Sequence, residues 1–116
     1  MDMQNIPFST TDWAEIPPTQ HPGETGVAYW RTRQFGAIRV RMVEYSPGYL
    51  ADHWCDKGHI LLCLEGELHT ELQDGRKIVL TQGSGIRNRG RGTGFPLRVG
   101  ARRDSRTSGA RLFIVD

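Results

Sequence analysis

The sequence predicts an all-β, single-domain fold in which short strands form one small antiparallel barrel. Apolar and polar residues alternate in several short runs, and turn signals separate these runs about every ten residues. No window keeps the helical period of about 3.6 residues. With 116 residues, of which 37% are hydrophobic and 24% charged, the chain has the size and composition of one soluble domain.

Two β-rich runs, residues 27–34 and 37–45, flank the turn Phe35-Gly36 and predict a hairpin. A second hairpin turn is predicted at Asp74-Gly75. The other predicted strands cover residues 60–64, 68–72, 76–80 and 110–115. Short strands with frequent turn signals are typical of a β-sandwich or a β-barrel.

The first 26 residues predict an arm lying on a barrel that spans residues 27–116, because four prolines disfavour both helix interiors and central sheet positions. Residues 12–15 are expected to start a short helical turn capped by Thr11 or Asp12. The expected apolar anchors of the arm are Phe8, Trp13 and Ile16. Such an arm would cover a sheet edge.

Residues 83–109 interrupt the strand pattern, because they hold seven glycines and seven arginines with few apolar residues. Basic charge is concentrated towards this end of the chain: residues 1–82 hold 7 Lys+Arg against 11 Asp+Glu, and residues 83–116 hold 8 against 2. A solvated loop, a nucleic-acid contact and an out-of-frame stretch remain open as interpretations. Phe95 is the only aromatic residue of the segment, which argues against a nucleic-acid partner.

Residues 47–59 carry the candidate metal ligands. In an extended chain His53 and Cys55 lie on one face, and His59 reaches the same interior from the next strand. Imidazole and thiolate bind zinc, copper, iron or nickel, and three protein ligands leave a position open for water or substrate. The sequence therefore predicts a metal site at His53, Cys55 and His59. The alternative is that the two histidines are partly buried and bonded to backbone groups.

This stretch resembles the first motif of the cupin superfamily, a glycine followed by His-x-His, a Glu and a second glycine. Gly48, His53, Cys55, His59 and Gly66 fall on that spacing, with Cys55 at the second His position and His59 at the Glu position. The chain looks closest to small single-domain cupins of uncharacterised activity that carry an Asp-His-Trp-Cys signature. The glycine turns that follow also look like those of a cupin.

The resemblance covers residues 37–83. It implies a double-stranded β-helix, or jelly-roll, barrel that holds a small molecule and a divalent transition metal such as Zn, Fe, Ni, Cu or Mn. The second cupin motif supplies a further histidine a few residues after the glycine that Gly83 matches. The sequence departs from the family here, because Ile86 and its neighbours include no histidine.

Four arginines on the predicted hairpin have two interpretations. Ile38, Val40 and Met42 share one face of their strand, and Arg39, Arg41 and Val43 share the other, as in a strand with one buried face. The ordinary interpretation places the arginines on a solvated face; the bolder hypothesis is that one points inward and binds a substrate carboxylate. The arginines concerned are Arg31, Arg33, Arg39 and Arg41.

The other histidines and aromatic residues are interpreted as structural. Cys63 is expected in the core, His69 on the surface and His21 in the arm. The aromatic residues of the strands are interpreted as packing groups rather than as a stacking platform. These are Tyr29, Trp30, Tyr45 and Trp54.

Two functions stay open: a metal-dependent enzyme acting on a small molecule, and a non-catalytic cupin that binds a small ligand or a partner without metal. A homodimer through edge strands or the arm is compatible with both. We expect a cytoplasmic protein without a membrane partner, because the sequence has neither a bilayer-spanning apolar run nor a signal peptide. Two cysteines are too few for a disulfide scaffold, so free thiols are expected.

Overall fold

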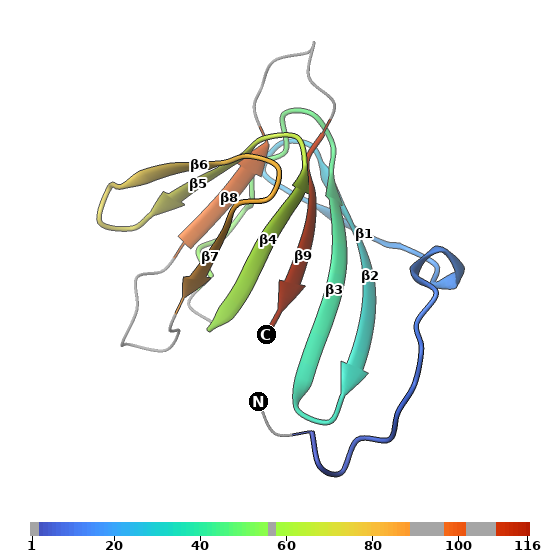
Figure 1. Cartoon of the computed structure of the whole chain (residues 1–116). Coiled ribbons are helices and arrows are strands. Elements are labelled where there is room, and N and C mark those ends of the chain that lie inside the picture. Colours follow the sequence, from blue (N-terminus) through green and yellow to red (C-terminus); the bar gives the residue numbers. More distant parts are fainter. Residues whose placement is uncertain (1–2, 56–57, 89–96, 102–108) are drawn as a thin grey trace.

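A computed structural model describes residues 3–55, 58–88, 97–101 and 109–116. These residues form two antiparallel sheets, a six-stranded one in the order β1-β2-β3-β9-β4-β7 and a three-stranded one in the order β6-β5-β8 (Figure 1). No helix in this part of the chain has the length and hydropathy of a membrane span. The elements are η1 (Trp13–Glu15), β1 (Thr19–Pro22), β2 (Val27–Phe35), β3 (Ile38–Tyr45), β4 (His59–Glu65), β5 (Leu68–Leu72), β6 (Lys77–Leu80), β7 (Gly85–Asn88), β8 (Leu97–Ala101) and β9 (Arg111–Val115).

The predicted hairpins are confirmed. Strands β2 and β3 pair from Ala28↔Tyr45 to Phe35↔Ile38, across a turn in which Gly36 has a φ of 58°. This left-handed conformation suits glycine because it has no Cβ. Strands β5 and β6 form the second hairpin, and β4 and β9 occupy the other two predicted strand positions.

Strand β9 joins the first hairpin to the rest of the sheet, because it lies between β3 and β4. Leu112 pairs with Val43 on one side and with Cys63 on the other, and all three side chains are fully buried. Cys63 is thus a core residue, as predicted, and both cysteines are free thiols. The buried core consists of Ala28, Val43, Tyr45, Tyr49, Ala51, Leu61, Cys63, Leu68, Leu80, Ala110, Leu112 and Ile114.

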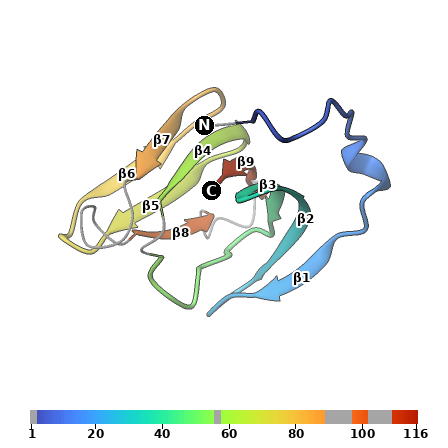
Figure 2. The same ribbon diagram turned by 90° about the horizontal axis from the view of Figure 1, so that it is seen from below.

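The amino-terminal segment runs around the outer side of β2 and β3 before it joins the sheet as the edge strand β1 (Figure 2). The predicted helical turn is present as η1, and the Asp12 carboxylate accepts a hydrogen bond from the Ala14 amide. Trp13 packs edge-on against Phe113 with 6.3 Å between the ring centroids. The expectation for Phe8 is wrong: its side chain is 95% exposed, so Trp13 is the aromatic anchor that has an apolar partner.

Two strands lie in the segment that shows no strand pattern. Strand β7 pairs with β4, and β8 pairs with β5, so the solvated-loop interpretation is wrong for residues 85–88 and 97–101. Their neighbours in the sheets supply the pairing that the local sequence does not signal. Arg98 donates to the Ala51 carbonyl at 2.8 Å and forms an ion pair with Glu24. Outside the described residues lie Arg89, Arg91, Phe95, Arg102, Arg103 and Arg106.

Candidate functional site

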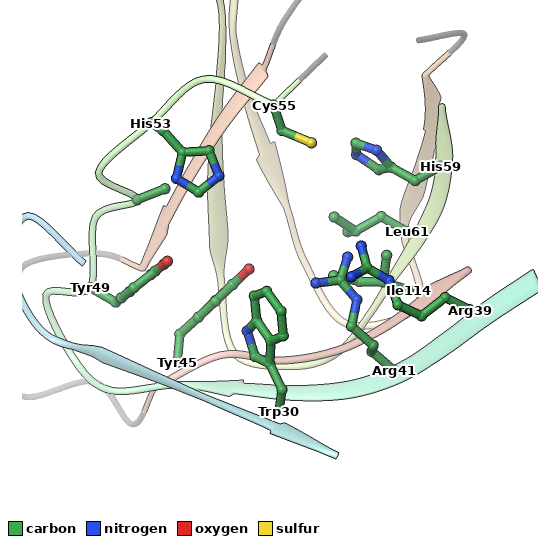
Figure 3. Close-up of a pocket in the computed structure, with 11 residues that line it drawn as sticks. Trp30, Arg39, Arg41, Tyr45, Tyr49, His53, Cys55, His59, Leu61 and Ile114 are labelled. Atoms are coloured by element: carbon green, nitrogen blue, oxygen red, sulfur yellow. The ribbon is translucent and has the colours of Figure 1, made fainter. Parts of the chain in front are cut away.

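A pocket opens on the inner face of the six-stranded sheet, where residues 49–55 pass in front of β2, β3, β4 and β9. Its cavity measures about 190 Å³. Figure 3 shows side chains from these strands and from this loop pointing into one space. The lining residues are Trp30, Arg39, Arg41, Tyr45, Tyr49, Ala51, His53, Cys55, His59, Leu61 and Ile114.

The three predicted ligands all line this pocket. His59 is the first residue of β4 and is 8% exposed, Cys55 is half-buried, and the His53 side chain is 73% exposed. They follow one another along one side of the pocket in the order His53, Cys55, His59 (Figure 3). Within the described part of the chain, no three His, Cys, Asp or Glu side chains form a group that could hold a metal ion. The structure therefore brings the three residues to one pocket without closing them into a coordination site.

The ring orientation of His53 is set by its neighbour. His53 Nδ1 donates to Asp52 Oδ1 at 2.6 Å, and this hydrogen bond lowers the pKa of the Asp52 carboxyl. A carboxylate on one ring nitrogen fixes the tautomer and leaves Nε2 as the ligating atom. His53 thus has the partner that a metal-binding histidine commonly uses.

Two arginines occupy the inner face of β3, which corrects the expectation of a solvated face. Arg39 and Arg41 line the pocket, and Arg41 is 8% exposed. They share their face with Val43 and Tyr45, both of which belong to the core. Both guanidiniums point into the pocket, beside Leu61 and Ile114 (Figure 3). The bolder hypothesis about orientation is therefore correct for this pair.

One carboxylate neutralises part of their charge. Asp116, whose side chain is 5% exposed, accepts hydrogen bonds from Arg39 Nε at 2.9 Å and Arg39 Nη2 at 2.7 Å. Arg41 Nη2 donates to the same Oδ2 atom at 3.0 Å. Burial raises the pKa of Asp116, but hydrogen bonding to Arg39 and the charges of Arg41, Arg39 and His59 outweigh this effect and hold the pKa below its usual value. Burial lowers the pKa of Arg41, while the hydrogen bonds to Asp116 raise that of Arg39.

Aromatic rings form another wall of the pocket, a role that the sequence interpretation did not give them. Tyr45 and Tyr49 stack with a centroid distance of 4.3 Å, and burial raises the pKa of both phenols, which keeps them neutral. Trp30 stacks on His21, with 3.6 Å between the ring centroids. The sequence could have indicated this position for Tyr45, because in a strand Tyr45 lies on the same face as Arg39 and Arg41.

Comparison with known proteins gives matches only at the level of structure. No family model and no curated protein matches the chain. A cupin-like protein from Thermotoga maritima matches with a TM-score of 0.68 and 18% identity over 90% of this chain and 80% of that one. A sugar phosphate isomerase from a cupin superfamily of Silicibacter pomeroyi matches with a TM-score of 0.68 and 15% identity over 92% and 74% of the two chains.

The chain has a cupin fold. The fold class predicted from strand rhythm and motif spacing is thereby confirmed. Fe(II)-HppE with the alternative substrate (S)-1-HPP matches with a TM-score of 0.73 and 13% identity, over 94% of this chain but only 60% of that one. At these identities the structural similarity establishes only the fold. The chemistry has to be inferred from the residues that line the pocket. In this cupin fold β7 follows Gly83, and its Asn88 pairs with His59.

Proposed function

We propose that this cupin-fold protein binds a small molecule in the pocket, together with a divalent transition metal ion held by His53, Cys55 and His59. The observation that carries the proposal is that these three residues, from the loop after Gly48 and from β4, all line one pocket. Such pockets, with apolar walls and a few converging polar groups, are the usual binding sites for small molecules.

The donor set fits a transition metal in its chemistry. Two imidazoles and a thiolate suit zinc, iron, nickel or copper, and Asp52 orients the His53 ring. Three protein ligands leave a position for substrate, and the ion would supply Lewis-acid chemistry there. The three side chains would have to draw closer to coordinate it, because they form no metal-holding group as they stand. The structural match to Fe(II)-HppE supports the metal by analogy of fold.

A metal-free binding protein is the second candidate, and one observation favours it. Arg39 and Arg41 line the pocket that a cation would have to enter, and the Asp116 side chain offsets only one of their two charges. Like charges in a partly buried site repel more strongly than they do in bulk water. The second candidate is a small-ligand-binding cupin in which the histidines contact the ligand directly.

Metal analysis of protein purified without added metal separates the two candidates. We expect close to one equivalent of transition metal per chain in the wild type, and a loss of most of it in His53→Ala and His59→Ala. His69→Ala is the matched control, because His69 lies on β5 outside the pocket and is partly exposed. Thermal unfolding of each variant verifies that it is folded. A folded wild type without metal, even after incubation with Zn²⁺ or Fe²⁺, would contradict the metal proposal and favour the second candidate.

A further inference from the structure

We propose that the pocket takes a small organic monocarboxylate, whose carboxylate binds the Arg39–Arg41 pair and whose apolar body lies against Trp30 and the aliphatic wall. This inference rests on the small-molecule binding proposed above and gives the ligand its chemical class. It does not depend on the metal.

Arg41 is not needed to neutralise the Asp116 carboxylate. Arg39 already satisfies Asp116 in a bidentate arrangement, with one donor on each carboxylate oxygen. Arg41 adds a single hydrogen bond to an oxygen that Arg39 also contacts. A purely structural pair needs only one guanidinium for one carboxylate. The second cation therefore leaves this group of three side chains with a net charge of about one positive unit.

Among the described residues, the Arg41 guanidinium also has few hydrogen-bond acceptors for its donors. A guanidinium has five N–H donors. Among the described residues, Arg41 makes one hydrogen bond, to Asp116, and its buried Nε has no partner. The guanidinium carbon also lies over the face of Trp30, 4.4 Å from the ring centroid. Burying a charge with unmet donors is costly, so an anion that binds beside Arg41 would supply hydrogen-bond acceptors that the described residues do not.

Charge and shape favour a monocarboxylate over other anions. A planar carboxylate matches the fork of a guanidinium, and one negative charge matches the net charge of the Arg39, Arg41 and Asp116 side chains. A phosphate dianion would exceed that charge. The walls beside the arginines are apolar, formed by Trp30, Leu61 and Ile114. A cavity of about 190 Å³ restricts the body of the ligand to a small group.

The other titratable groups of the pocket are two phenols, two imidazoles and one thiol. Tyr45 and Tyr49 are neutral phenols, which can donate to an anion. His53 is exposed and lies on the side of the pocket away from Arg39 (Figure 3), whereas His59 is buried and lies near Asp116. The ligand end opposite the carboxylate would therefore face His53.

Calorimetric titration tests the inference with benzoate and butyrate as probes and benzamide as the neutral counterpart of benzoate. Titrations are run on chelator-treated protein and again on protein incubated with Zn²⁺. We expect saturable binding of at least one of the two carboxylates at one site per chain in both preparations, with benzamide about tenfold or more weaker. Inorganic phosphate should bind more weakly than the carboxylate.

Variants of Arg41 test whether this residue binds the carboxylate. Arg41→Gln should weaken carboxylate binding about tenfold or more, and Arg41→Lys, which keeps the charge but not the fork, should weaken it by less. Arg33→Gln is the matched control, because Arg33 lies outside the pocket, beside Phe35 on β2. If Arg41→Gln does not fold, Arg41→Lys and the comparison with benzamide still test whether the carboxylate binds at Arg41.

Three outcomes would overturn the inference: no carboxylate binding by the wild type, equal binding of benzamide, or unchanged binding in the Arg41 variants. These failures are distinct from failure of the proposed metal site. Carboxylate binding by a protein that takes up no metal leaves the inference intact. Carboxylate binding that requires Zn²⁺ and ignores Arg41 would contradict the inference while supporting the metal.

Discussion

Replacing Gly109 with alanine should prevent native folding or lower the free energy of unfolding by more than about 3 kcal/mol. A Cβ at this position would lie 1.6 Å from the Tyr45 carbonyl oxygen and 2.8 Å from the Tyr45 carbonyl carbon. Both are backbone atoms, so no side-chain rotation relieves the overlap. The Tyr45 amide donates to the Ala110 carbonyl at 2.8 Å, which holds the two backbones side by side. The alanine must therefore separate β9 from β3 where the pocket residue Tyr45 lies.

Urea unfolding followed by circular dichroism measures this effect. Gly48→Asn is the control, because Gly48 has a φ of 77° but a Cβ there would meet no atom within 4 Å. Asparagine tolerates this backbone conformation better than most residues, so we expect a loss of about 1 kcal/mol or less. A Gly109→Ala protein with the wild-type unfolding midpoint would show that the two strands do not approach each other this closely.

The strands that could be predicted are those whose own residues specify them. Residues 27–45 alternate around a glycine turn, so the β2–β3 hairpin and its register follow from local sequence. Strands β7 and β8 could not be predicted, because their arginines and glycines carry little β-propensity. Pairing with β4 and β5, which are distant in sequence, specifies them instead.

The sequence indicated the histidines and the cysteine of the pocket but not its arginines. Motif spacing indicated that His53, Cys55 and His59 converge, and all three line the pocket. The inward face of β3 was missed because Ile38, Val40 and Met42 form the more apolar of its two faces. Those residues lie on the outer face, which is partly covered because Trp13 packs on β9 there. When both faces of a strand are covered, hydrophobicity does not indicate which face lines a pocket.

Replacing Asp116 with asparagine should lower the free energy of unfolding at pH 7 by about 2–4 kcal/mol. The substitution leaves Arg39 and Arg41 next to each other without their shared carboxylate, and Arg41 keeps no other hydrogen-bond partner among the described residues. Glu44→Gln is the matched control. Glu44 pairs with Arg31 and Arg111 on the exposed side of the sheet, where an ion pair contributes about 1 kcal/mol or less.

The pH dependence of this difference gives a second measurement. The native pKa of Asp116 is lowered by its arginines, so its stabilising effect is complete above the unfolded-state pKa of about 3.9 and is lost as the pH falls towards the lower native pKa. The gap in unfolding free energy between wild type and Asp116→Asn should therefore be constant from pH 7 to about pH 5 and shrink below pH 4. Urea unfolding at pH 7, 5 and 3 measures it. A gap that stays constant down to pH 3 would mean that Asp116 does not titrate there, and a gap that widens on acidification would contradict the ion-pair assignment.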